Sequence, residues 1–233
     1  MNQDLFILYK LATRSRPQRF AETLESIHNN SSNANYLVLV SIDEDDESMQ
    51  KYIDDKELGL GYPHLNVVVV NGTSKNKIDA INRDVEKVTE KWNIKWDILV
   101  NISDDMLITS NQFDVVVRTA FTQTTDLFLH LPDGYVNETL STMSIMGKSY
   151  YDRFGYIYHP SYKSVYCDNE ATDVAKMLDK YLYINQKLFV HNHPANVGRH
   201  LWDSGYERTE TQELHTQDCL NYNDRKSKNF PND

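Results

Sequence analysis

The sequence predicts an α/β fold in which a mostly parallel, doubly wound sheet is flanked by helices. Two observations lead to this prediction. Short apolar runs that suit buried strands alternate with longer segments whose apolar residues recur at helical spacing. Several of the apolar runs end in polar clusters, which is where ligands bind in open parallel sheets.

Four strands are predicted in the first half, at residues 5–11, 36–42, 65–70 and 96–102. The predicted helices between them cover residues 17–30, 48–58 and 75–92. The first of these begins at Pro17, a residue that favours the first turn, and places Phe20, Leu24 and Ile27 on one face. This alternation of strand and helix favours parallel strands.

The second half is less regular. Helical segments are predicted at 112–122, 148–154 and 168–180, and short strands at 127–131, 140–146 and 188–190. We therefore expect one domain over residues 1–195, made of halves 1–110 and 111–195. A helical or irregular extension is expected at 196–233, and its last ten residues are expected to be mobile.

Composition restricts the function. The chain has 233 residues, of which 40% are hydrophobic, enough for a buried core. The net charge of −10 argues against sequence-independent binding to a nucleic-acid backbone. Cys167 and Cys219 are too few for a disulfide framework, and the first apolar stretch is too short for a signal peptide or membrane span. We expect reduced cysteines and a cytoplasmic protein.

The acidic turn Ser103-Asp104-Asp105 follows the fourth predicted strand. Paired carboxylates at a strand end suit a hard divalent cation, Mn²⁺ or Mg²⁺, that is shared with diphosphate oxygens. The structural alternative is a solvated turn or a helix cap. His191 and His193 follow the last strand, and either could add a nitrogen ligand. Because alternate residues of an extended segment face opposite ways, we expect only one of them to point into the site.

Other polar residues lie at the ends of the first two strands. The loop from Thr13 to Arg16, which includes Arg14, could meet a nucleotide base or phosphate. Asp43 or Asp45 could accept hydrogen bonds from a base N–H group or a ribose hydroxyl. Polar ends on the same edge of one sheet converge, so we expect these residues to share a site with the acidic turn.

Two further groups are candidates. Lys77 and Asn82 lie near the start of the helix after the third strand, where a lysine is often only a solvated charge. Asp168, Glu170 and Asp173 begin a later helix, and one of them could be a general base, although acidic residues also cap helices. No G-x-G-x-x-G, G-x-x-x-x-G-K-[ST], G-x-S-x-G or C-x-x-C motif is present. The sequence therefore lacks the motifs that a dehydrogenase, a P-loop protein or a serine hydrolase would need.

In order, these motifs resemble the GT-A glycosyltransferases, in particular the family-2-like inverting enzymes of bacteria and bacteriophages. The resemblance covers residues 4–200. It rests on the T-R-S-R-P loop, the acidic end of the second strand, Lys77-x-x-Ala80-x-Asn82, I-S-D-D-M at 102–106, D-N-E at 168–170 and H-N-H-P at 191–194. It implies a GT-A-type, Rossmann-like sheet with a smaller acceptor-side region.

The resemblance also implies residue roles. A nucleotide base, often uracil, would be surrounded by Thr13, Arg14, Asp43 and Lys77. Asp104 would approach the ribose or donor sugar, and Asp105 would hold the metal as the last aspartate of a D-x-D motif. Ser103 stands where that motif has its first aspartate, which leaves metal dependence open. One of His191 and His193 would complete the metal shell.

The implied reaction transfers a sugar from a nucleoside-diphosphate sugar, often a UDP-sugar, to an acceptor hydroxyl. Asp168 is the first candidate for the base and Glu170 the second; a retaining mechanism stays open. Two other functions are alternatives. A sugar-phosphate nucleotidyltransferase normally has a glycine-rich first loop, which residues 13–17 lack. A non-catalytic protein that binds sugars or a partner is the other.

The acceptor is open: a glycan, a small molecule or a modified base. Phage enzymes of this type glycosylate modified DNA bases, and a local groove could use Arg153, Lys163 and Arg199. The charge of −10 predicts weak or no binding to duplex DNA.

Overall fold

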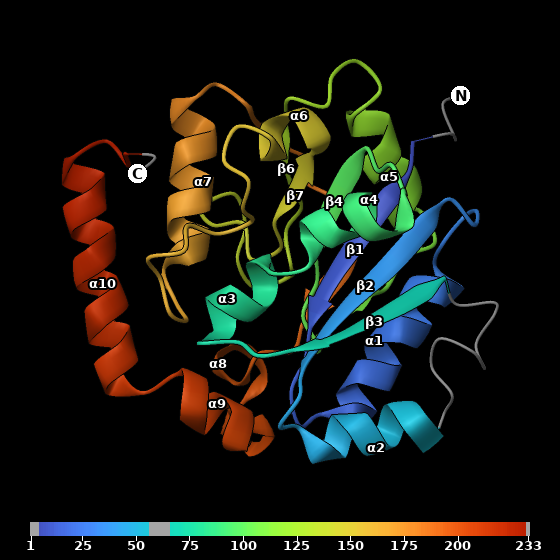
Figure 1. The fold of residues 1–233 in the computed structure, drawn as a ribbon. Coiled ribbons are helices and arrows are strands. Elements are labelled where there is room, and N and C mark those ends of the chain that lie inside the picture. Colours follow the sequence, from blue (N-terminus) through green and yellow to red (C-terminus); the bar gives the residue numbers. More distant parts are fainter. Residues whose placement is uncertain (1–4, 56–65, 232–233) are drawn as a thin grey trace.

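A seven-stranded sheet forms the centre of the protein (Figure 1). The computed structural model describes residues 5–55 and 66–231. The strand order is β3-β2-β1-β4-β7-β6-β8. The bounds are β1 Ile7–Ala12, β2 Tyr36–Asp43, β3 Val67–Gly72, β4 Ile98–Asn101, β6 Phe128–His130, β7 Ile145–Gly147 and β8 Tyr181–Tyr183. Strands β1 to β4 pair in parallel, β7 is antiparallel to β4 and β6, and β8 is parallel to β6. The prediction of a mostly parallel sheet is confirmed.

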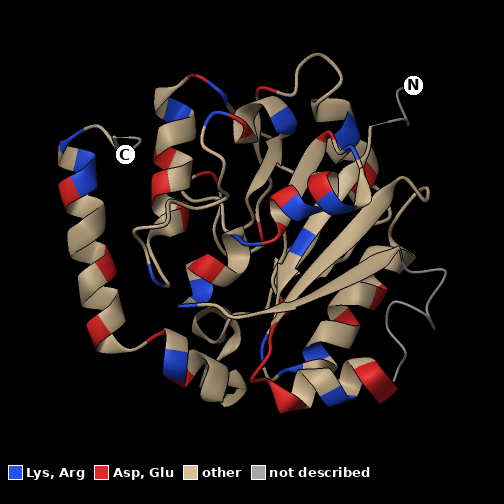
Figure 2. Ribbon diagram, viewed as in Figure 1, with Lys and Arg blue, Asp and Glu red and all other residues tan. Residues whose placement is uncertain are grey.

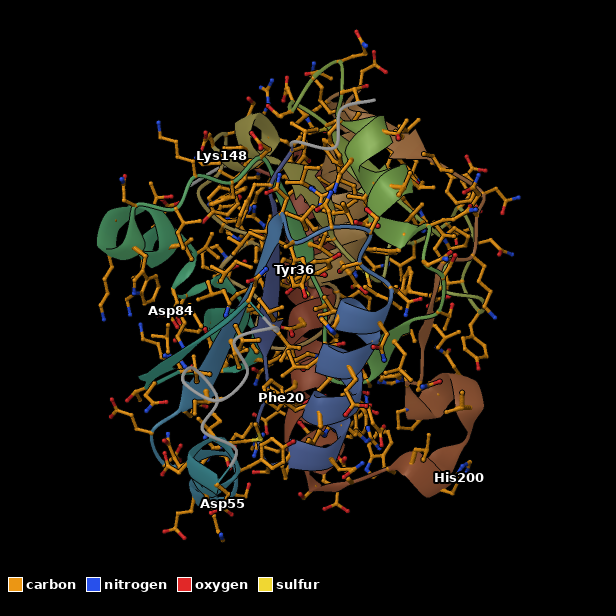
Figure 3. The ribbon with its side chains drawn as sticks, turned by 90° about the vertical axis from the view of Figure 1, so that its right-hand side faces the viewer. Phe20, Tyr36, Asp55, Asp84, Lys148 and His200 are labelled. Atoms are coloured by element: carbon orange, nitrogen blue, oxygen red, sulfur yellow. The ribbon has the colours of Figure 1, made fainter. Side chains whose placement is uncertain are left out.

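Helices cover both faces of this sheet. One core cluster joins β1 to helices α1 (Pro17–Asn29), α2 (Glu47–Asp55) and α5 (Phe113–Ala120), and includes Phe20 and Tyr36 (Figure 3). The other joins β1 to α3 (Lys77–Asn82), α4 (Val85–Trp92), α6 (Lys148–Tyr151) and α7 (Cys167–Met177). Ile7 belongs to the first cluster and Leu8 to the second, as the two-residue period of a strand requires. Most charged residues lie on helices and loops rather than on the strands (Figure 2).

A second, two-stranded sheet extends the carboxyl edge of the first. Strand β5 (Met106–Ile108) follows the acidic turn and pairs antiparallel with β9 (Phe189–His191). The register places Met106 opposite His191. As a result, residues about 85 positions apart in the sequence lie side by side at the point where β4 ends.

The C-terminal part is helical. It contains α8 (Pro194–Val197), a 3-10 turn (Arg199–Leu201), α9 (Ser204–Thr209) and α10 (Gln212–Ser227). Figure 1 shows α9 below the sheet edge and α10 alongside α7. The expectation that residues 224–233 are mobile is wrong for those described: Arg225 is buried and forms an ion pair with Glu170.

Other differences are local. The predicted helix at 75–92 is broken at Asp84, whose φ of 75° is left-handed, because the buried Asp84 carboxylate accepts a hydrogen bond from Ser41 at 2.7 Å. Strands β5 and β8 were not predicted, and the predicted strand at 140–146 is reduced to β7. The last residues of the predicted helix at 48–58 and the first residue of the predicted strand at 65–70 lie outside the described residues. Within those residues, none of the helices combines the length and apolar character needed to cross a membrane.

Candidate active site

A cavity of about 1110 Å³ opens at the carboxyl edge of the parallel strands. Its walls come from the loops after β1, β2, β3 and β4, the start of α7, and the segment that contains α8 and α9. The predicted residues that line it are Thr13, Arg14, Arg16, Asp43, Asp45, Lys77, Asp104, Asp105, Asp168, His191 and His193. The candidates Asn82, Glu170 and Asp173 do not line it.

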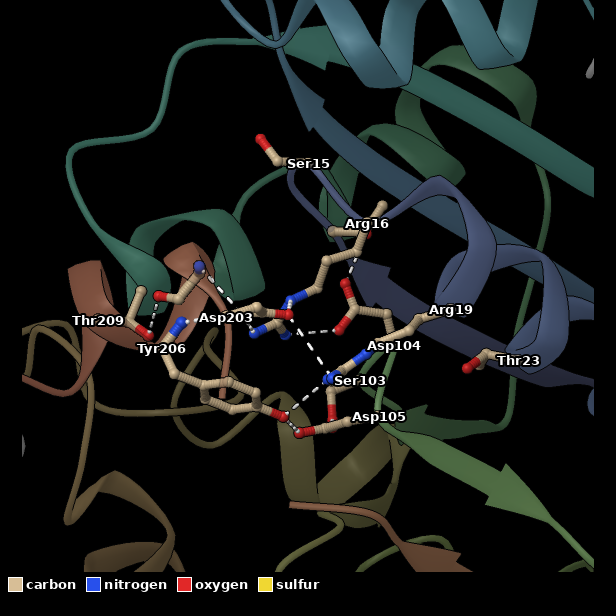
Figure 4. A network of polar contacts seen from close by, with 12 residues as sticks. Ser15, Arg16, Arg19, Thr23, Ser103, Asp104, Asp105, Asp203, Tyr206 and Thr209 are labelled. Carbon is tan, nitrogen blue, oxygen red and sulfur yellow. Dashed lines mark hydrogen bonds and ion pairs between the residues drawn. The ribbon is translucent and has the colours of Figure 1, made fainter. Parts of the chain in front are cut away.

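Asp104 is buried and held from two sides. Oδ2 accepts a hydrogen bond from Thr13 Oγ1 at 2.6 Å, and Oδ1 accepts one from Arg16 Nη1 at 2.9 Å (Figure 4). Burial raises the pKa of Asp104, and the neighbouring Asp105 carboxylate adds to the rise, while Arg16 opposes it. The loop after β1 and the turn after β4 are thus joined through one carboxylate.

Asp105 faces His191 across the second sheet. Oδ2 lies 3.4 Å from His191 Nε2, accepts a hydrogen bond from Tyr206 at 2.6 Å, and Oδ1 accepts one from Ser103. Although burial opposes ionisation, His191 holds the pKa of Asp105 well below its usual range. Burial would also lower the pKa of His191, but the carboxylates of Asp105 and Asp133 raise it to about 9.

His193 does not continue strand β9. It begins α8, where its Nδ1 accepts a hydrogen bond from the Ala195 backbone at 3.2 Å, and its Nε2 lies 2.8 Å from Glu210 Oε1. The rings of His191 and His193 are 5.5 Å apart, and both line the cavity. The expectation that only one histidine points into the site is wrong: the pairing of β9 ends at His191, and both histidines line the cavity.

Arg14 organises the opposite end of the cavity. Its guanidinium donates to Asp43 Oδ2 at 2.9 Å and to Asp45 at 2.5 and 2.7 Å. The other Asp43 oxygen, Oδ1, is buried and has no hydrogen-bond partner; the nearest cation, Arg83, is 3.7 Å away. The Ser74 hydroxyl is likewise buried at the cavity without a partner. A carboxylate acceptor and a hydroxyl are therefore available here to a ligand.

Asp168 is the carboxylate at the start of α7. It lines the cavity, and its Oδ1 accepts a hydrogen bond from the Asn169 backbone at 3.0 Å. Burial raises the pKa of Asp168, an effect that Lys77 partly opposes. Among the described residues, no cation lies within ion-pair distance of it, so it is the least neutralised acid of the cavity.

Comparisons with known proteins bear on the fold. No protein-family model and no curated protein matches the chain. Solved structures match over most of it. The mannosyltransferase PcManGT from Pyrobaculum calidifontis, in complex with GDP-Man and Mn²⁺, has a TM-score of 0.65 at 13% identity, covering 85% of this chain and 60% of that one.

Two more structures are similar. The Mycobacterium tuberculosis glucosyl-3-phosphoglycerate synthase has a TM-score of 0.55 at 12% identity, covering 81% of this chain and 72% of that one. TarS from S. aureus in complex with UDP has a TM-score of 0.59 at 12% identity, covering 79% and 59%. The fold is GT-A. The chain spans about 60% of the length of the mannosyltransferase.

Two predicted residues have other positions in this GT-A fold. Glu170 lies on α7 and accepts hydrogen bonds from Arg225 of α10 at 2.8 Å and from Tyr162 at 2.6 Å. It does not line the cavity. The Asn82 side chain binds the backbone of the loop at 157–158, with its amide 2.6 Å from the carbonyl of Tyr158. Both side chains hold the fold around the cavity rather than line it.

The GT-A cavity also contains residues that the sequence did not single out. Tyr206, Arg208 and Glu210 enter it from α9 and its end. Asp133 does not line the cavity but lies 3.7 Å from Nδ1 of His191. The only local signal was Asp203, which begins α9 and accepts hydrogen bonds from the backbone of Gly205 and Tyr206.

Of the three cations considered for a DNA groove, two have side chains that the structure describes, and these two have different partners. Arg153 pairs with Asp126, and Lys163 lines the cavity. The Arg199 side chain lies outside the described residues.

Charge is distributed unevenly within the cavity. Of its six carboxylates, all except Asp168 face an arginine or histidine. Within the part of the chain that the structure describes, Lys75, Lys77 and Arg208 also line the cavity and have no carboxylate within ion-pair distance. A protein with a net charge of −10 therefore has unpaired cations inside this cavity, which suits an anionic ligand.

Proposed function

We propose that the protein is a glycosyltransferase that moves a sugar from a nucleoside-diphosphate sugar to an acceptor hydroxyl with the help of a divalent cation. The observation that carries the proposal is the convergence of paired acidic residues, a histidine and unpaired cations in one cavity of a GT-A fold. The cavity exceeds the roughly 300–1,000 Å³ of a typical small-molecule site, which leaves room for a donor and an acceptor together.

The nucleotide is assigned to the end of the cavity near β2. Asp43 Oδ1 and the Ser74 hydroxyl are buried without partners, and a base or ribose supplies the N–H and O–H groups that would satisfy them. Arg14 keeps Asp43 in place through its other oxygen. Thr13 and Arg16 bond to Asp104 of the acidic turn, and Lys77 lines the same cavity, so a diphosphate that follows the nucleoside would be bound in their neighbourhood.

Asp105 and His191 suit a metal ion. Oδ2 and Nε2 lie 3.4 Å apart, close to the spacing of two neighbouring ligands on one ion, and carboxylate and imidazole are both ligands of Mn²⁺. Asp133 near Nδ1 suits the carboxylate that commonly orients a ligating histidine. Among the described residues, no group of three or more acidic, histidine or cysteine side chains is placed to hold a metal ion by itself, so diphosphate oxygens and water would supply the other ligands. When bound, the cation neutralises charge on the leaving diphosphate.

Asp168 is assigned as the general base. It takes the proton from the acceptor hydroxyl, whose oxygen bonds to the anomeric carbon as the bond from that carbon to the diphosphate breaks. Its raised pKa brings it closer to that of an effective base at neutral pH. With one displacement the anomeric configuration inverts.

Support also comes from ligands of similar structures. The mannosyltransferase contains GDP-Man and Mn²⁺, and the phosphoglycerate synthase contains UDP and Mn²⁺. Both ligand sets combine a nucleoside diphosphate or its sugar conjugate with a divalent cation.

The test is release of nucleoside diphosphate from UDP-glucose, UDP-GlcNAc and GDP-mannose with Mn²⁺. We expect slow hydrolysis of at least one donor, lost in Asp105→Ala and kept in Asp173→Asn. Asp173 lies on the same helix as Asp168 but bonds to Tyr222 at 2.7 Å outside the cavity, so it is a matched control. Metal-dependent nucleotide binding without release would favour a non-catalytic protein, and absence of both would refute the proposal.

A further inference from the structure

Arg16 joins the loop after β1 to helix α9. Its Nε and Nη2 donate to the two oxygens of Asp203 at 3.0 and 2.6 Å, while Nη1 donates to Asp104 at 2.9 Å (Figure 4). The guanidinium also lies over the ring of Tyr206, 4.1 Å from its centre. A Cβ atom at Gly205 would come within 2.7 Å of the guanidinium, so this approach requires glycine there. Asp203, Gly205 and Tyr206, at the start of α9, thus all contact the guanidinium of Arg16.

Each of the four carboxylate oxygens of Asp104 and Asp105 accepts a hydrogen bond from a side chain of the protein. Thr13 and Arg16 occupy Asp104, and Ser103 and Tyr206 occupy Asp105. The Tyr206 hydroxyl bonds to Oδ2 of Asp105, which is also the oxygen that faces His191. The phenol therefore lies at the oxygen where a cation shared with His191 would bind.

We propose that Asp203, Tyr206 and Arg16 form a clasp that closes the metal position, and that a divalent cation bound with the donor displaces the Tyr206 hydroxyl from Asp105. This inference rests on the proposed function. A carboxylate oxygen that already accepts a strong hydrogen bond is a poorer cation ligand, because the bond must be given up or weakened when the cation binds. The clasp thereby makes metal binding depend on the additional binding free energy that coordination by the diphosphate oxygens supplies.

The contacts of α9 are consistent with such a displacement. In the described structure this six-residue helix is held by polar and ring contacts rather than by apolar packing: Arg16 and Arg19 contact its tyrosine, and Trp202 and His193 lie against the same ring at 5.5 and 5.0 Å. None of its residues other than Gly205 and Tyr206 is buried. Tyr206 is therefore the one buried side chain of α9 that its movement would uncover.

The test is the affinity for Mn²⁺, measured by calorimetry with and without UDP. Tyr206→Phe keeps the ring beneath Arg16 and removes only the hydroxyl. We expect it to bind Mn²⁺ at least roughly tenfold more tightly than the parent protein, the ratio that corresponds to one hydrogen bond to a charged group. Asp203→Asn, which weakens the hold of Arg16 on α9, should change the affinity in the same direction.

Tyr222→Phe is the matched control. It removes a Tyr-to-Asp hydrogen bond of 2.7 Å on α10, outside the cavity, and should leave Mn²⁺ affinity unchanged. A second readout is the emission of Trp202, which packs on Tyr206 and should respond to Mg²⁺ with UDP; Trp202→Phe should remove that response.

The outcomes separate the two proposals. Asp105-dependent Mn²⁺ binding that is equal or weaker in Tyr206→Phe would overturn the clasp and leave the metal-dependent transferase standing. No Mn²⁺ binding in either protein, with or without UDP, would overturn both.

Discussion

Replacement of Arg225 tests whether the C-terminal helix α10 is locked to helix α7. Arg225 and Glu170 are 6% and 4% exposed, and the guanidinium makes bonds of 2.8 and 2.9 Å to the two carboxylate oxygens. Arg225→Met leaves the Glu170 carboxylate buried with Tyr162 as its one side-chain donor among the described residues. Loss of one partner of a buried ion pair costs about 3–5 kcal/mol. For a chain of this length, the melting temperature should fall by roughly 10 °C.

Urea denaturation gives the free energy of unfolding directly. The control is Lys226→Met, a substitution on the same helix as Arg225. It removes a 2.8 Å ion pair with Asp173 of α7, in which Lys226 is half exposed, and should cost at most about 1 kcal/mol. Adding Glu170→Leu to Arg225→Met should recover most of the loss, because two uncharged residues need no pairing. If Arg225→Met costs no more than the control, the C-terminal helix is not locked by this pair.

Further predictions concern the site and the core. Asp168→Asn should lower kcat by about 10²–10⁴ while nucleotide affinity is kept. Because burial raises the pKa of Asp168, the fall in rate toward low pH should occur above the ordinary carboxyl range in the parent protein. Asp43→Asn should weaken UDP binding roughly tenfold in calorimetry, whereas Asp45→Asn at the exposed end of the same arginine should not. Lys10 is fully buried against Ser41, and burial lowers its pKa from 10.5 to about 7. The unfolded chain therefore binds more protons between those pH values, so the free energy of unfolding should rise with pH across this window by up to roughly 5 kcal/mol. Denaturation at pH 7 and pH 10 should show that Lys10→Met abolishes this rise; an unchanged slope would contradict the assignment.

The first half of the fold could be predicted because its signals are local. Apolar runs mark β1, β2 and β4, and the polar residues that end them meet because parallel strands share an edge. Thr13 and Asp104 are 91 positions apart, yet strand topology alone brings them together. The register of β5 and β9 was not predicted, although it is what places His191 beside Asp105.

The remaining features depend on distant partners. Acidic residues in the first turn of a helix are favourable whether or not they are catalytic, so Asp168 and Glu170 could not be separated until Arg225, 55 positions away, was placed against Glu170. Helix α9 is short and polar, with no apolar period to mark it. Tyr206 reaches Asp105 over 101 positions, a contact that no local pattern indicates.

The central claim is that a nucleoside diphosphate and a divalent cation bind together at the end of β4. A crystal soaked with UDP and Mn²⁺ tests it most directly, since anomalous scattering locates the metal. The account predicts Mn²⁺ bound to Asp105 and His191, the diphosphate between this ion and Lys77, the base against Asp43, and the Tyr206 hydroxyl displaced. UDP bound elsewhere, or Mn²⁺ bound away from Asp105, would contradict it.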